Sequence, residues 1–141
     1  MKEFQDLYLV TSDIIGAAFE VRKHTGRALR EKYYEAALSF ELTQRGHEVK
    51  RQVTIPAIYK GEIIDDSYKA DLIVNDAVII EVKALSHMKE SECRQLITYL
   101  KLSDYRIGYL INFGASDFSI GKSTDPLPYT QGIYRYVNNF R

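Results

Sequence analysis

The sequence of 141 residues predicts a mixed α/β fold, in which a sheet of about four or five strands is flanked by helices. Three observations lead to this prediction. The chain begins with two stretches of good helix formers. Its middle holds near-continuous apolar runs, which are typical of strands buried on both faces. A third helical stretch then precedes another apolar run, and such an alternation is typical of a sheet with helices packed on it.

Two helices are expected at the start of the chain. Thr11 and Ser12 are favourable N-cap residues, so the run over 13–26 predicts a first helix that begins just after them. The stretch 29–46 predicts a second helix, because good helix formers there carry apolar residues at helical spacing. Each run ends in a glycine, the residue most common just past a helix end.

The next segments read as strands. The stretch 49–61 is rich in β-branched residues, and Pro56 favours a bend or a sheet edge within it. A turn is expected over 61–66. The apolar runs 68–74 and 78–83 predict two buried strands joined by a short connection.

The second half of the chain continues this alternation. A third helix is expected over 90–103 and another buried strand over 105–114, while the alternating segment 132–137 predicts a short edge strand. The length predicts one domain, residues 1–141, in which residues from about 116 to 141 form a C-terminal extension packed on the core.

Composition excludes several classes of protein. There are 19 Lys plus Arg and 19 Asp plus Glu, so any binding to a polyanion must come from local basic patches. The single cysteine, Cys93, excludes an intramolecular disulfide, and no apolar run is long enough to cross a membrane. A cytoplasmic protein without membrane association is therefore expected. Basic residues that could line a phosphate path, or belong to a solvated mixed surface, are Lys50, Arg51, Lys69, Lys89, Arg94 and Lys101.

Charged residues within the two middle strands raise the question of function. With a two-residue connection, Asp71 would face Ile80 and the charges would scatter over both faces. With a three-residue connection, Asp71 would lie opposite Glu81, and Lys83 would share their face because side chains alternate with period two. Three-residue hairpin loops are common, so the clustering register is a reasonable expectation.

Two adjacent carboxylates repel each other unless a cation lies between them. Mg²⁺ or Mn²⁺ prefers oxygen ligands, and two carboxylates with a backbone carbonyl suit either ion. Lys83 could then position a water or stabilise charge on a phosphate, which predicts metal-assisted hydrolysis of a phosphodiester. The alternative is a structural ion cluster, because an acid-x-lysine tripeptide is a weak pattern by itself.

At these residues the sequence resembles the PD-(D/E)XK nuclease superfamily, with Asp71 as the motif aspartate and Glu81-Val82-Lys83 as the E-x-K. The whole chain from about residue 14 to 115 is similar to one branch, the GxxExxY family. That similarity rests on the segments IGAAFEV, YYEAALSFEL, the Lys60-Gly61 turn, YKADLIV, VIIEVKAL, QLITYLKL and LINFG. Glu31 and Tyr34 match the branch's name motif, and Ala28 stands where its glycine would be.

The resemblance implies a restriction-endonuclease-like fold with the core order α-α-β-β-β-α-β. It implies a Mg²⁺-dependent (or Mn²⁺-dependent) nuclease acting on DNA or RNA, with Asp71, Glu81 and the Val82 carbonyl as metal ligands. Lys83 is expected to assist the attacking water, and Glu35 to support the metal or its water shell, with Glu31 one helical turn away.

Gln95 and Tyr99 form a Q-x-x-x-Y, which the resemblance implies supports the active site and contacts nucleic acid. The alternative for this pair is a tyrosine that packs on the sheet beside a solvated glutamine. A homodimer is compatible with cutting two strands. The alternative function is a catalytically silent module with the same fold, which binds nucleic acid or protein.

Overall fold

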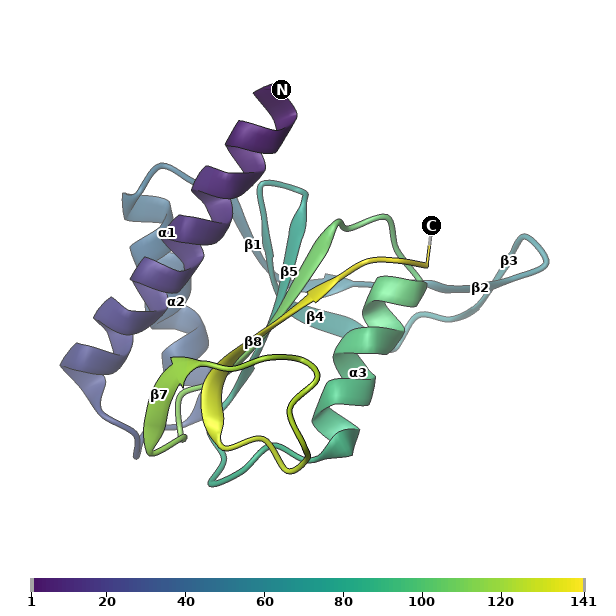
Figure 1. The fold of residues 1–141 in the computed structure, drawn as a ribbon. Coiled ribbons are helices and arrows are strands. Elements are labelled where there is room, and N and C mark those ends of the chain that lie inside the picture. Colours follow the sequence, from purple (N-terminus) through teal and green to yellow (C-terminus); the bar gives the residue numbers. More distant parts are fainter. Residues whose placement is uncertain (1, 141) are drawn as a thin grey trace.

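The computed structural model describes residues 2–140, with side chains from residue 6 onward. It is the mixed α/β fold that the sequence predicts, and its sheet has the strand order β1-β4-β5-β6-β8-β7. In Figure 1, α1 and α2 lie on one side of this sheet and α3 lies on the other. The elements of the first half are α1 (Lys2–Thr25), α2 (Glu31–Gln44), β1 (Val49–Thr54), β2 (Ala57–Tyr59), β3 (Glu62–Asp65), β4 (Lys69–Val74) and β5 (Val78–Lys83). Those of the second half are α3 (Glu90–Lys101), β6 (Ile107–Asn112), β7 (Asp117–Ile120) and β8 (Gln131–Val137).

Successive residues of the central strands belong alternately to two apolar clusters, one on each face of the sheet. On β5, Val78, Ile80 and Val82 pack against α1 and α2. Ile79, between them, packs on the opposite face together with residues of α3. This alternation places the Lys83 side chain toward α3, which matters for the site described below.

The first helix begins earlier than the sequence predicts, at residue 2 instead of 13. Val10 is almost fully buried and extends the apolar stripe of the helix by another turn. Thr11 therefore lies inside the helix, where its hydroxyl donates a hydrogen bond to the Tyr8 carbonyl at 3.0 Å instead of capping an end. The predicted end of this helix is confirmed, and Gly26 just after it has a φ of 70°.

The predicted turn over 61–66 is wrong, because Glu62–Asp65 is a strand paired with β2 in a separate two-stranded sheet. The actual turn is Lys60-Gly61, where both residues have positive φ, as tight hairpins require. This hairpin extends away from the main sheet (Figure 1).

The C-terminal part of the chain adds strands that the sequence signalled poorly. The segment predicted as an edge strand is β8, which pairs with β6 on one side and with β7 on the other. It is interior because the short strand β7, which the sequence did not predict, covers its outer side. The sheet thus has six strands instead of four or five, while the predicted core order of helices and strands is confirmed. None of the described helices is long and apolar enough to span a membrane.

Candidate functional site

Asp71 and Glu81 face each other where β4 and β5 lose their regular pairing. Leu72 pairs with Ile80, so the three-residue connection places Asp71 opposite Glu81. Beyond that point, side chains replace ladder bonds. The Asp71 N–H donates to Glu81 Oε1 at 3.0 Å, and the Val82 N–H donates to Asp71 Oδ2 at 2.8 Å. The two carboxylates are thereby fixed at the open end of the hairpin.

The Val82 carbonyl points from β5 toward β4, the strand that carries Asp71. Along a strand, successive peptide groups point to opposite sides. The Lys83 carbonyl points toward β6, because it accepts a hydrogen bond from the Phe113 N–H at 2.8 Å. The Val82 carbonyl therefore points toward β4, in the same direction as the Val82 N–H that binds Asp71.

A third acid approaches from α2. Glu35 is buried, and its Oε2 accepts a hydrogen bond from Arg51 Nε at 3.0 Å. Its Oε1 accepts from Gln52 Nε2 at 2.7 Å, and the same amide nitrogen donates to Asp71 Oδ1 at 3.2 Å. Because a primary amide has two N–H groups, Gln52 can bridge the two acids.

The backbone of Gln52 is unusual for a strand residue. Its φ is 52°, in the left-handed region that residues with side chains rarely adopt. Its neighbours Arg51 and Val53 pair regularly with β4, whereas Gln52, opposite Asp71, does not. Strained residues of this kind persist where the surroundings determine them. Here the strain accompanies the bridge between Glu35 and Asp71.

A hydrogen-bonded chain continues from Lys83 to α3. The Lys83 ammonium lies 3.9 Å from Glu81 Oε2 and donates to Gln95 Oε1 at 2.8 Å. Gln95 Nε2 donates to the Tyr99 hydroxyl at 3.1 Å, and this hydroxyl donates to the Lys69 carbonyl at 2.9 Å. The Q-x-x-x-Y pair therefore holds the lysine and ties α3 to the start of β4.

The electrostatics of the site reflect concentrated negative charge. Burial, together with the neighbouring Asp71 carboxylate, raises the pKa of Glu81 to about 8. Burial also raises the pKa of Asp71, although the hydrogen bond from the Val82 N–H opposes the shift. One buried proton is thus favoured where the two acids meet, unless a cation takes its place.

The outer members of the predicted set lie at different depths. Glu31, at the start of α2, is exposed at the rim of the site. Partial burial raises its pKa, and Lys83 opposes that shift while Asp71 adds to it, so these charges lie within reach. Tyr99 is buried, and burial together with Glu81 raises its pKa to about 12.

The structure brings most of the predicted residues together. A hydrogen bond connects Asp71 with Glu81, and an ion pair connects Glu81 with Lys83. Glu35 is connected to Asp71 through the side-chain amide of Gln52. Gln52 was missed, and Arg51, expected on a phosphate path or on a solvated mixed surface, binds Glu35 instead. The sequence holds no signal for the positive φ of Gln52. A polar pair in the strand beside Asp71 would have been the only cue.

The donor set suits a hard divalent ion. Among the described residues, no three His, Cys, Asp or Glu side chains converge into a metal-binding group. The two carboxylates are nevertheless adjacent, and the Val82 carbonyl points toward β4, the strand that carries Asp71. Mg²⁺ usually takes only one or two protein carboxylates and keeps several waters. The raised pKa of Glu81 further indicates that the pair would gain from a cation.

A comparison with protein families gives the superfamily to which the chain belongs. The sequence model of the PD-(D/E)XK nuclease superfamily matches residues 8–122, most of the chain. The chain belongs to the PD-(D/E)XK nuclease superfamily. Its six-stranded mixed sheet flanked by helices is consistent with the restriction-endonuclease-like fold. Members of the superfamily typically depend on divalent metals, and nucleic acid is the class of partner that membership implies. Neither the curated proteins nor the solved structures give a significant match.

Proposed function

We propose that this PD-(D/E)XK protein is a metal-dependent nuclease that hydrolyses phosphodiester bonds of nucleic acid, with DNA as the first substrate class to test. The observation that best supports this function is the arrangement of charged residues at the open end of the β4–β5 hairpin. There, Asp71 and Glu81 replace ladder bonds and the Lys83 ammonium lies 3.9 Å from Glu81. Burial and the neighbouring Asp71 carboxylate raise the pKa of Glu81 to about 8, so a cation between the two acids would be bound favourably.

In this proposal Asp71, Glu81 and the Val82 carbonyl hold Mg²⁺ or Mn²⁺. The ion would supply a Lewis acid for the phosphate and lower the pKa of a bound water. The backbone N–H groups of Asp71 and Val82 keep the two carboxylates in place before any ion arrives. The chain thus needs little reorganisation to bind.

Lys83 would stabilise the negative charge that develops on the phosphate as water attacks and the leaving oxygen departs. Gln95 occupies one of its three N–H donors, and the others remain available to a water or a phosphate oxygen. Glu35 would act through Gln52, by holding the amide that positions Asp71. Glu31, at the rim of the site, would bind waters in the hydration shell of the metal ion.

The test is cleavage of single-stranded and duplex DNA and RNA by the purified protein, with Mg²⁺, with Mn²⁺ and with EDTA. We expect metal-dependent cleavage that falls at least a hundredfold in Lys83→Met, whose folding is checked by circular dichroism. Lys122→Met, an exposed lysine on the segment between β7 and β8, is the matched control and should cleave like the wild type.

A second candidate, a silent module of the same fold that binds nucleic acid or protein, makes a different prediction for the same assay. The net charge of zero and the replacement of the motif glycine by Ala28 favour it. In that case, wild type and Lys83→Met would be equally inactive with every substrate and metal.

We also propose membership of the GxxExxY branch and one domain over residues 1–141. The two named residues have separate roles that suit the pattern. Glu31 lies at the rim, while the Tyr34 hydroxyl donates to the Gly26 carbonyl at 2.7 Å and accepts from the Leu29 N–H at 3.2 Å. Tyr34 thereby fixes the turn that precedes α2. The interior position of β8 in the sheet supports the single domain.

A further inference from the structure

We propose that a pocket beside the site, between the start of β4 and α3, binds an unpaired nucleobase of the substrate strand. This rests on the proposed nuclease function and names its substrate class: single-stranded nucleic acid, or a duplex end that has opened. The pocket is shallow and open to solvent, with a volume of about 430 Å³. Its lining residues are Tyr68, Ser91, Glu92, Arg94, Gln95 and Thr98.

Tyr68 supplies an aromatic wall that is held in place yet open to solvent. Its ring meets the buried ring of Tyr99 edge-on, with centroids 6.1 Å apart and planes at 79°. Because Tyr99 is fixed by the Lys69 carbonyl and Gln95, this contact restrains Tyr68. Tyr68 remains 36% exposed. An ordered, accessible aromatic face is what a nucleobase stacks on.

The charge of the lining favours a base over a phosphate. Arg94 pairs with Glu90 at 2.7 Å, so its positive charge is already countered. Glu92 caps α3 by accepting hydrogen bonds from Ser91 and from the backbone of Lys89. Two acids, Glu90 and Glu92, and one base, Arg94, leave one net negative charge at the pocket, so it offers no net positive charge to a phosphate. Ser91, Gln95 and Thr98 place polar groups beside the edge of a base.

Gln95 connects this pocket to the reaction site. The residue lines the pocket and also accepts the hydrogen bond of the Lys83 ammonium at 2.8 Å. A nucleotide whose phosphate lies near Lys83 would therefore have the pocket beside its base. A base that is paired and stacked within a duplex cannot enter such a pocket without leaving the stack. The pocket thus predicts a preference for unpaired strands.

The experiment measures binding in EDTA by fluorescence anisotropy, so that the absence of metal prevents cleavage. The probes are a short labelled oligothymidylate and an abasic oligonucleotide of the same length, which carries the same phosphates without bases. We expect the wild type to bind the thymidylate about tenfold more tightly, as stacking of one base predicts. Tyr68→Ala should lose this preference, and Tyr68→Phe, which keeps the ring, should retain it.

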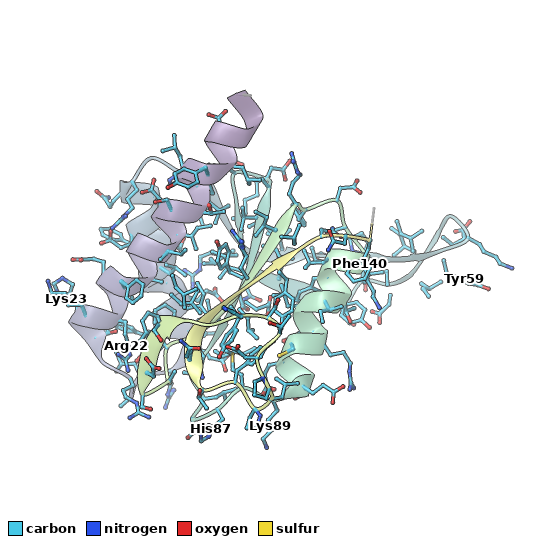
Figure 2. All side chains as sticks on the ribbon, viewed as in Figure 1. Arg22, Lys23, Tyr59, His87, Lys89 and Phe140 are labelled. Carbon is cyan, nitrogen blue, oxygen red and sulfur yellow. The ribbon has the colours of Figure 1, made fainter. Side chains whose placement is uncertain are left out.

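The matched control is Tyr59→Ala. Tyr59 is 58% exposed and lies on the β2–β3 hairpin, away from the sheet (Figure 2), so its loss should leave the preference intact. An equal preference in wild type and Tyr68→Ala, or no preference in the wild type, would overturn the proposal. This result is independent of cleavage: a protein with the Tyr68-dependent preference but no activity keeps the pocket and loses the proposed reaction.

Discussion

The two halves of the β4–β5 hairpin differ in what holds their strands together. Near the turn, three opposed pairs of apolar residues lie in a regular ladder and are almost fully buried. At the open end, the next pair is Asp71 and Glu81, and carboxylates take the place of the ladder. The first half gains stability from burial, whereas the second concentrates charge, which costs stability. Substitutions near the turn should therefore lower stability, whereas substitutions at the open end should lower activity with little loss of stability.

The largest effect is expected from Asp71→Asn, which removes one proposed metal-binding charge while keeping the shape. Cleavage should fall by about a thousandfold, equivalent to about 4 kcal/mol in the barrier. Above pH 8, where the Glu81 carboxyl is ionised, the free energy of unfolding should change by less than about 1 kcal/mol, because relief of repulsion with Glu81 offsets a weakened hydrogen bond. Single-turnover cleavage and urea unfolding of the same preparations test both parts. If activity were lost only in proportion to the loss of folded protein, the open end of the hairpin would serve stability and not catalysis, which would contradict this comparison.

Ile80→Ala, one position away in the regular half, should lower the free energy of unfolding by about 3 kcal/mol, because it leaves a cavity in the core. Ile80 is fully buried, with an exposed fraction of 0%, whereas Ile64 on the outer hairpin is 66% exposed. Ile64→Ala is therefore the matched control and should cost less than about 0.5 kcal/mol. Equal losses in the two variants, measured by urea unfolding, would show that burial does not distinguish them.

The pH dependence of stability should expose the charge at the open end. The pKa of Glu81 is raised to about 8 in the folded protein, from 4.5 for an unperturbed glutamate. The native state therefore binds the proton more tightly than the unfolded chain does. Stability from this group is fully present below pH 4.5 and is lost as the pH rises toward 8.

Glu81→Gln removes this titration. In EDTA, the variant should exceed the wild type in free energy of unfolding by on the order of 2 kcal/mol at pH 8, and by much less near pH 5. Chemical unfolding at both pH values gives the difference. A gap between the variants that stays constant with pH would assign the effect to something other than the carboxylate.

The smallest effect is expected at Gln52, where backbone strain and side-chain role can be separated. Gln52→Gly fits the positive φ, while Gln52→Ala keeps the strain, so the glycine variant should be more stable by about 1 kcal/mol. Both variants lose the bridge to Glu35 and Asp71, so both should cleave more slowly to a similar extent. Unfolding and cleavage of the pair check this. Full activity in the glycine variant would mean that the bridge does not position Asp71.

The sequence predicted the parts of the fold that depend on apolar periodicity and failed where local signals were weak. The buried runs of β4, β5 and β6 were recognisable because both of their faces are covered. β7 is four residues long, with only partial burial, and so gave no such signal. Because β7 was not predicted, β8 was predicted as an edge strand, although it lies between β6 and β7. The start of α1 was missed because Thr11 and Ser12 are cap residues in type but lie within a continuous helix.

The site was predictable to the extent that it lies on strands. A three-residue connection and the alternation of side chains suffice to place Asp71, Glu81 and Lys83 together. Gln95 and Tyr99 were found only through the resemblance to the nuclease superfamily, whose members can carry the same four-residue spacing after the E-x-K strand. Gln52 could not be found, because its role depends on a left-handed backbone conformation and on how β1 lies beside α2. Both are properties of the assembled fold.

Metal binding tests the central claim most directly. Mg²⁺ and Mn²⁺ would be titrated calorimetrically into the wild type and into the Asp71→Asn/Glu81→Gln double variant, which preserves shape but removes both charges. The wild type should bind at least one Mn²⁺, with a proton released near neutral pH as the Glu81 carboxyl ionises. The double variant should give no binding heat. Equal heats in both proteins would place the metal elsewhere and contradict the proposed site.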